Sequence, residues 1–188
     1  MCGRYSLNLE NSKSNFKEET LVKFSKIFTY KNSDISPSTN NPVIFFRNNE
    51  YIFDLFKWGL NFDWLPKGRV LFNLRSETVL DKGFSKNLIL KQRCLVPFNS
   101  YYEWQNNGSS KQKFELKTNY HISYFAAIYS KLGSEGEYSI LTKASSPNVQ
   151  HIHERNPLII NNNLIRKWFS DDFKDILNTS IELDFSKI

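Results

Sequence analysis

The cysteine at position 2 carries the most distinctive chemistry in this sequence. It directly follows the initiator methionine in the run Met1–Tyr5, MCGRY. Cysteine is small enough for that methionine to be trimmed during synthesis, which leaves an α-amine and a thiol on one residue. Such a 1,2-aminothiol captures an aldehyde as an imine and then as a thiazolidine, or serves as an N-terminal nucleophile whose own amine is the base. The alternative is that Cys2 is an accident of an N-terminal tail.

Both reactive groups of an N-terminal cysteine are available near neutral pH. An α-amine of pKa ~7.8 is roughly one-seventh neutral at pH 7, and a thiol of pKa ~8.5 is a few per cent thiolate. Local electrostatics can raise either fraction. Cys2 is therefore a candidate nucleophile without strong tuning.

Glu103 is a candidate acid or base. It lies in the segment Cys94–Trp104, CLVPFNSYYEW, between Tyr102 and Trp104. Desolvation among large rings raises the pKa of a carboxyl group and suits it to proton transfer. The alternative is an outward-facing glutamate on an alternating strand.

Polar groups also follow the apolar run Val70–Phe72, where Asn73 and Arg75 begin the segment NLRSET. Side chains that emerge at the end of a strand are well placed for a site. The alternative is a helix cap with a surface ion pair between Arg75 and Glu77.

Two histidines, His151 and His153, share one face if their segment is a strand. They can bind a metal, although no third ligand is evident, or His153 can shuttle protons beside the basic Arg155. A surface loop with satisfied histidines is the alternative.

Aromatic and proline side chains stand among basic residues at Pro37, Trp58 and Trp64. Such faces stack on unpaired bases, at about 1–3 kcal/mol per base. Core packing is their default interpretation, and Trp58 is expected in the core.

The elements that position these residues are predicted to be mostly strands with a few helices. Strands are expected over 43–46, 51–60, 120–129, 138–144 and 158–160, and helices over 15–28, 85–92, 163–169 and 171–177. Because strands joined by turns dominate, the predicted fold class is α+β, with a curved, mostly antiparallel and barrel-like sheet.

Composition sets further bounds. The chain has 188 residues, 40% of them hydrophobic, which suits a single domain over 1–188. It has no apolar run near 18 residues and no apolar core in its first twenty residues, so we expect a cytoplasmic protein without a membrane span. Cys2 and Cys94 are the only cysteines, and we expect both to be reduced. The net charge of +6 favours an anionic partner, of which nucleic acid is the commonest.

Taken together, these segments resemble the SOS response-associated peptidase (SRAP) family. The resemblance runs in order through most of the chain and is carried by seven segments: Cys2–Tyr5, Ile35–Pro37, Trp58–Leu60 with Trp64, Asn73–Thr78, Cys94–Trp104, Thr142–Ala144 and His153–Leu158. It implies a β-rich α+β domain with a basic channel for single-stranded DNA. It also implies covalent trapping of abasic sites through the N-terminal cysteine.

The resemblance implies a role for each matching residue. Cys2 is the implied crosslinking nucleophile, Asn73 orients its amine or the opened sugar, Glu103 is the acid or base, and His153 assists ring opening. Implied DNA contacts are phosphate binding by Arg4, Arg75 and Thr142 and stacking by Pro37 and Trp64. No metal and no cofactor is implied. The expected partner is abasic single-stranded DNA, bound by a monomer that associates with the nucleoid on damaged DNA.

The chain departs from the family pattern in places. Asp34 stands where the loop usually has Asn, Lys57 where Arg is frequent, and Asn99–Ser100 where Asp-Gly is usual. The chain ends at Ile188, so we expect a C-terminus shorter than is usual for the family.

Three functions follow from the residues and the resemblance. The first is a DNA-damage response protein that forms a thiazolidine crosslink with abasic sites, with lyase-type activity. The second is a thiol peptidase that acts with Cys2, Glu103 and His153, either on other peptides or only on its own leader. The third is a non-covalent reader of single-stranded or modified DNA.

Overall fold

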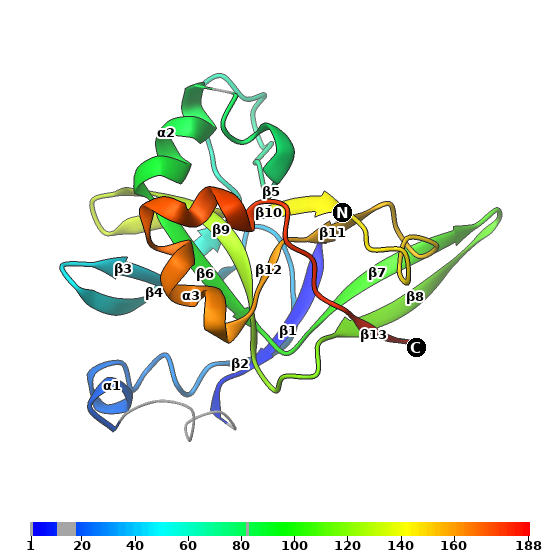
Figure 1. The fold of residues 1–188 in the computed structure, drawn as a ribbon, viewed down its shortest axis with the longest axis horizontal. Coiled ribbons are helices and arrows are strands. Elements are labelled where there is room, and N and C mark those ends of the chain that lie inside the picture. The colour runs from blue at the N-terminus through cyan, green and yellow to red at the C-terminus, as the bar shows by residue number, and fades with distance from the viewer. Residues whose placement is uncertain (1, 11–17, 82) are drawn as a thin grey trace.

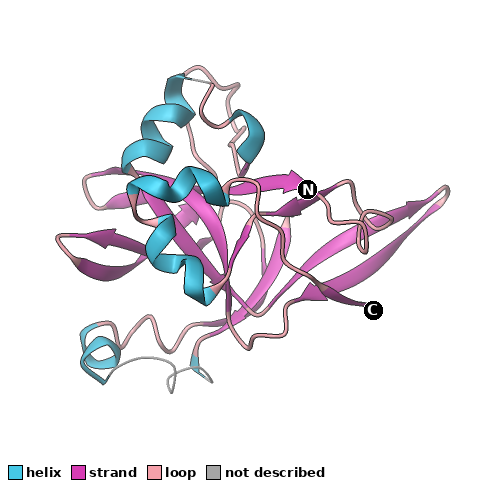
Figure 2. Ribbon diagram, in the orientation of Figure 1, coloured by secondary structure: helices cyan, strands magenta, loops and turns pink. Residues whose placement is uncertain are grey.

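The computed structural model describes residues 2–10, 18–81 and 83–188 as a strand-rich chain with short helices. Figure 1 follows the chain from its N-terminus to its C-terminus, and Figure 2 separates helices from strands. The strands are β1 Arg4–Asn8, β2 Lys31–Ile35, β3 Asn40–Arg47, β4 Glu50–Trp58, β5 Asn73–Arg75, β6 Arg93–Phe98, β7 Ser100–Asn107, β8 Ser110–Lys117, β9 Ser123–Leu132, β10 Glu135–Ala144, β11 Arg155–Pro157, β12 Ile159–Ile160 and β13 Asp184–Lys187. The helices are α1 Glu18–Lys23, α2 Gly83–Lys91 and α3 Ile165–Trp168, with 3₁₀ turns η2 Ser76–Thr78, η3 Asn162–Leu164 and η4 Asp171–Ile176.

The larger sheet closes on itself. Strand β10 pairs with β4 on one side and β9 on the other, and β4–β3, β3–β6 and β6–β9 complete the ring. Only the β10–β4 pairing in this ring is parallel. The predicted α+β class with a curved, mostly antiparallel and barrel-like core is confirmed. Closure also removes the sheet edges that an open sheet would expose.

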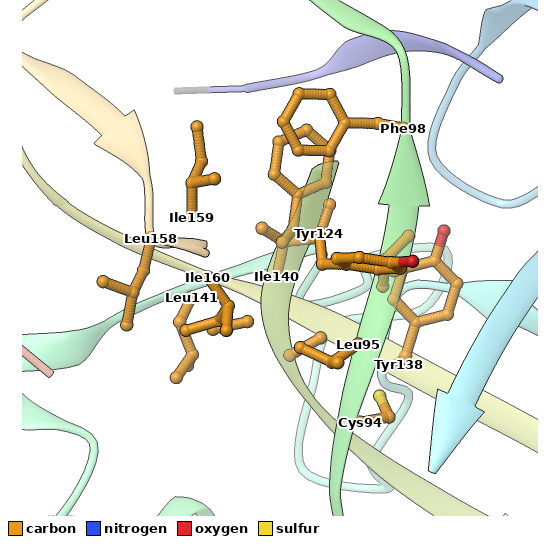
Figure 3. Close-up of a cluster of buried hydrophobic side chains, with 14 of the residues drawn as sticks. Cys94, Leu95, Phe98, Tyr124, Tyr138, Ile140, Leu141, Leu158, Ile159 and Ile160 are labelled. Atoms are coloured by element: carbon orange, nitrogen blue, oxygen red, sulfur yellow. The ribbon is translucent and has the colours of Figure 1, made fainter. Parts of the chain in front are cut away.

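Apolar strands fill the interior of this ring. The first six residues of β9 are all buried, as are the last five of β6. Figure 3 shows Cys94 and Leu95 of β6 in this cluster with Tyr138 of β10. Cys94 is fully buried, and both cysteines are free thiols. Trp58 is fully buried too and donates its indole N–H to the Phe72 carbonyl at 2.8 Å, so its predicted place in the core is confirmed.

The second sheet brings the N-terminal strand beside Glu103. Its strand order is β13-β8-β7-β1-β2, and β1 pairs antiparallel with β7. In this register Arg4 lies opposite Tyr102 and Tyr5 opposite Tyr101. The start of β1 therefore lies next to the middle of β7. The β7–β8 hairpin projects from the molecule, and β13 runs along β8 near the C-terminus (Figure 1).

Local signals mispredicted some elements. The helix expected over 15–28 is only α1, with turns after Lys23, and its first residues lie outside the described chain. The β7–β8 hairpin over 100–117 was not predicted, because β8 is largely polar and is ordered by pairing with β7. The strand expected to begin at Tyr120 begins at Ser123.

Gly59 turns the chain out of β4 toward the loop that carries Trp64. Its φ of +128° favours glycine, and a Cβ there would lie 2.6 Å from Val70 Cγ2. Within the described residues, no helix has the length and apolar character that a membrane span needs.

Candidate active site at the N-terminal cysteine

Cys2 lies in the interior of the fold just before β1. Its side chain is fully buried, and its Sγ lies 3.8 Å from the Arg4 carbonyl oxygen. Burial raises the pKa of this thiol well above its usual range, and the negative charge of Glu103 raises it further. The thiol is therefore protonated at neutral pH.

Asn73 holds the backbone of Cys2. Strand β5 runs parallel to β10, which places Asn73 opposite Ile140 at the barrel end. The Asn73 Nδ2 donates a hydrogen bond to the Cys2 carbonyl at 2.6 Å. Its Oδ1 is buried and accepts no hydrogen bond from the described part of the chain. This amide can therefore still accept a hydrogen bond from a group that enters beside Cys2.

Glu103 faces inward from β7. It is only 3% exposed, while its neighbours Tyr102 and Trp104 lie half-buried on the opposite face of the strand. The outward-facing alternative is therefore wrong. Burial raises the pKa of Glu103 to about 7, although the positive amino terminus acts in the opposite direction. A carboxyl group with this pKa both takes and gives protons near neutral pH.

His153 is oriented by the backbone of Arg155. The Arg155 N–H donates to His153 Nδ1 at 3.0 Å, so in neutral His153 the ring proton lies on Nε2. Burial lowers the pKa of His153, and the positive amino terminus lowers it further. His153 is therefore neutral at pH 7 and presents an Nε2–H donor.

Electrostatic effects and one hydrogen bond link these four residues. The amino-terminal charge acts on the pKa values of Cys2, Glu103 and His153, and Asn73 is hydrogen-bonded to Cys2. Cys2 and Glu103 come from the second sheet, whereas Asn73 and His153 come from segments along β10 of the barrel. The site thus lies where the two sheets meet. It combines a thiol, an amide, a titrating carboxyl and a neutral imidazole.

The residues predicted to contact DNA lie in different environments. Arg4 is half-buried and forms an ion pair with Asp34, with Nη1 2.6 Å from Oδ1, while Arg75 is exposed. Trp64 is 59% exposed, and Pro37 is half-buried in the turn after β2. Thr142 is fully buried and donates its hydroxyl to the Leu74 carbonyl at 3.2 Å. In this structure, Thr142 supports its neighbours and offers no exposed hydroxyl to a phosphate.

Comparison with known proteins identifies the chain. The sequence profile of the family described as SOS response associated peptidase (SRAP) matches residues 1–183. The chain belongs to the SRAP family.

Two curated relatives from Bacillus subtilis (strain 168) are similar to this sequence. The abasic site processing protein YoaM is 24% identical over 73% of this chain and 65% of its own length. The abasic site processing protein YoqW is 25% identical over 90% of this chain and 80% of its own length. The matched region thus spans just under two thirds of YoaM and four fifths of YoqW.

The SRAP chain also shares its fold with solved structures. An X-ray structure of a Bacteroides thetaiotaomicron protein superposes with a TM-score of 0.80 at 20% identity, covering 100% of this chain and 92% of the other. At this identity the likeness shows a common fold.

The structure adds supporting residues that sequence reasoning missed in this SRAP domain. Glu77 pairs with Arg155, with Oε2 2.8 Å from Nη2, and not with Arg75 as the surface alternative proposed. Arg155 also donates to the Thr142 carbonyl at 2.8 Å, which ties the His153 segment to β10. In the sequence, only the opposite charges of Glu77 and Arg155 could have indicated this pair, because the two residues lie 78 positions apart.

Trp64 also has aromatic support that its sequence neighbours hide. Its ring stacks on Phe62, with centroids 5.3 Å apart, and lies 5.3 Å from the ring of Phe84. Phe84 comes from α2, so only the fold brings it to this loop. The three rings form an aromatic platform whose exposed member is Trp64, with Phe62 and Phe84 half-buried beneath it.

No metal centre is evident in the described ranges, because they hold no group of three His, Cys, Asp or Glu side chains arranged for a metal.

Proposed function

We propose that this SRAP chain captures abasic sites in single-stranded DNA as a covalent thiazolidine through Cys2, after removal of Met1. Its relatives YoaM and YoqW are named abasic site processing proteins. The observation that carries the proposal is Glu103, a buried carboxyl of pKa about 7 within electrostatic reach of both the Cys2 thiol and the amino terminus.

The chemistry begins at the amine of trimmed Cys2. An abasic deoxyribose equilibrates with an open-chain aldehyde, and the neutral amine adds to its carbon. The resulting carbinolamine loses water and becomes an imine, which requires a proton on the departing oxygen. Glu103 supplies and recovers that proton, while the Nε2–H of His153 assists opening of the sugar ring. Asn73 aligns the amine through the carbonyl that it already binds and its open Oδ1.

The thiol then closes the ring. Its sulfur bonds to the imine carbon, the C=N π electrons pass to nitrogen, and the thiol proton follows to that nitrogen. Because burial keeps the thiol protonated, the amine reacts first and the thiol second. The same burial disfavours the second candidate function, a thiol peptidase, because peptide cleavage needs the thiolate as its first nucleophile.

Cationic, aromatic and proline side chains on the surrounding surface bind a short stretch of single-stranded DNA in this proposal. Arg75 and Arg4 offer cations to the flanking phosphates, and the Trp64 platform and Pro37 offer stacking faces next to the lesion. One chain supplies all four residues of the site, so the proposal needs only a monomer. It places the protein in the cytoplasm, on damaged DNA of the nucleoid.

The test mixes the full chain, with Met1 removal verified by intact mass, with a single-stranded oligonucleotide that carries one abasic site. Wild-type protein is expected to give an adduct that survives denaturing electrophoresis without a reductant. Cys2→Ala is expected to give none, since an imine alone hydrolyses. Cys94→Ala is the matched control, because Cys94 is a buried thiol of the barrel core.

An adduct of Cys2→Ala that is as stable as the wild-type adduct would overturn the proposal. Turnover of unrelated peptides that requires Cys2 would favour the thiol peptidase. Salt-sensitive DNA binding that survives Cys2→Ala, with no adduct from either protein, would favour a non-covalent reader.

A further inference from the structure

Tyr101 carries a buried hydroxyl that has no role in the proposed reaction. Its side chain is fully buried, and its hydroxyl has no hydrogen-bond partner in the described chain. A buried polar group without a partner costs free energy, so it calls for an explanation. Its ring packs edge-on against the stacked rings of Phe98 and Phe125, with centroids 6.1 and 5.9 Å away.

Tyr101 lies on β7, the strand that pairs with β1 just after Cys2. It lies two residues before Glu103 on β7, so both side chains point to the same face of the strand. It pairs in register with Tyr5, three residues after Cys2. Tyr5 differs in one respect, because its hydroxyl has a partner in Tyr138 at 2.9 Å.

Electrostatics agrees with this placement. Burial raises the pKa of Tyr101 well above its usual range, and the charges of Cys2 and Glu103 raise it further. The charges of both groups therefore act on Tyr101, which remains a neutral O–H donor throughout the working pH range.

We infer that Tyr101 is a further catalytic residue, which donates its phenol O–H to the Cys2 sulfur as the thiol loses its proton. This inference rests on the proposed function and adds a residue to its second step. When sulfur attacks the imine carbon, the thiol proton passes by way of Glu103 to the imine nitrogen. Tyr101 neither gains nor loses a proton, and its hydrogen bond stabilises the negative charge on sulfur.

The test uses formaldehyde, a small aldehyde that forms a thiazolidine with an N-terminal cysteine without DNA. Tyr101→Phe is compared with wild type and Tyr124→Phe, all with Cys2 as the first residue by intact mass. Tyr124 is a matched control, because it is a buried tyrosine on β9 beside Pro97. Formation of the closed adduct is followed by mass and by loss of the free thiol from pH 6 to 10.

Tyr101→Phe is expected to slow ring closure about tenfold at pH 7, because a hydrogen bond to a charged group is lost. The defect should shrink only toward pH 10, where a growing fraction of the buried thiol ionises without help. Other titrating groups facing this region remain in both variants: Glu103 on β7, Tyr5 on β1, Tyr138 on β10 and His153 before β11. Tyr124→Phe should leave the profile unchanged.

Stability separates this role from a structural one. Tyr101→Phe removes a hydroxyl without a partner, so its Tm should equal or exceed that of wild type. An unchanged closure rate, a defect that does not depend on pH, or a lower Tm would each overturn the inference. Because no DNA is present in this test, a wild-type protein that forms the thiazolidine with formaldehyde but no adduct with abasic DNA would overturn only the proposed function.

Discussion

Two glutamates close to the N-terminal site have opposite electrostatic environments. Glu103 on β7 is 3% exposed, and burial raises its pKa to about 7. For Glu77 in η2, burial also acts to raise the pKa, but hydrogen bonds from Arg155 and from the Ala144 N–H outweigh it and lower the pKa. The same side chain is thus an acid–base group in one place and a fixed anion in the other.

In this fold, one glutamate is placed to transfer protons and the other to hold a structural ion pair. Glu77 remains ionised and holds Arg155, whose backbone N–H orients His153. For Glu103 burial is the dominant influence, so its carboxyl group titrates near neutral pH. A carboxyl group of each kind is needed, because a group that must change protonation cannot also anchor a cation.

Glu103→Gln is expected to have the largest effect. It removes the titrating carboxyl but preserves its shape, so crosslink formation should slow at least about 100-fold, as is typical for loss of general acid–base catalysis. Rates are measured with the abasic oligonucleotide on denaturing gels. Glu115→Gln on the neighbouring strand β8 is the control. A Glu103→Gln protein that crosslinks at the wild-type rate would remove Glu103 from the mechanism.

Glu77→Gln is expected to act on stability more than on chemistry. It takes a charged partner from Arg155, whose side chain is only 12% exposed, so unfolding free energy at pH 7 should fall by about 1–2 kcal/mol. Because the folded pKa of Glu77 is lowered, its contribution is present above the ordinary pKa and is lost as pH falls through the folded value. Denaturant titrations should therefore separate the variant from wild type at pH 7 and bring them together in acid.

Crosslinking by Glu77→Gln should fall less than tenfold, through looser positioning of His153. A loss as large as that of Glu103→Gln would mean that the two glutamates share one role and would break the comparison.

Asp34→Asn is expected to have the smallest effect. Asp34 is an exposed carboxylate paired with Arg4, with 64% and 42% of their side chains exposed. Exposed ion pairs contribute little, so releasing Arg4 for a phosphate should tighten single-strand binding less than about fivefold at low salt. Fluorescence anisotropy measures the change, with Glu50→Gln, which breaks the exposed pair with Lys23, as control. Weaker binding by Asp34→Asn would argue against a phosphate role for Arg4.

Much of this organisation could be predicted from local sequence. Alternation and apolar runs predicted strands β3, β4, β9 and β10 of the barrel but not β6, and Trp58 was expected in the core because core packing is the default for a large aromatic side chain. Glu103 is buried as the flanking rings led us to expect, but Tyr102 and Trp104 lie on the opposite face of β7, so other residues bury it. Sequence position alone also singled out Cys2, because only a cysteine behind the initiator methionine can offer both an amine and a thiol.

The remainder depends on pairs that are distant in sequence. Glu77 and Arg155 meet only because η2 and β11 lie at the same end of β10. The sequence also could not predict that the Tyr101 hydroxyl is buried without a hydrogen-bond partner in the described residues, because burial and hydrogen bonding are properties of the packed chain. The polar strand β8 lacks a clear apolar alternation and acquires its structure from β7.

The most direct test of this account is a carboxyl titration by ¹³C NMR of the wild-type protein with labelled glutamate, assigned through Glu103→Gln and Glu77→Gln. The account predicts that Glu103 titrates with a midpoint at about 7 and that Glu77 titrates below its ordinary value of 4.5. Stability should correspondingly fall as pH rises from 4.5 to about 7, because ionising Glu103 is more costly in the folded state. A Glu103 midpoint near 4.5, close to that of an exposed glutamate, would contradict the account.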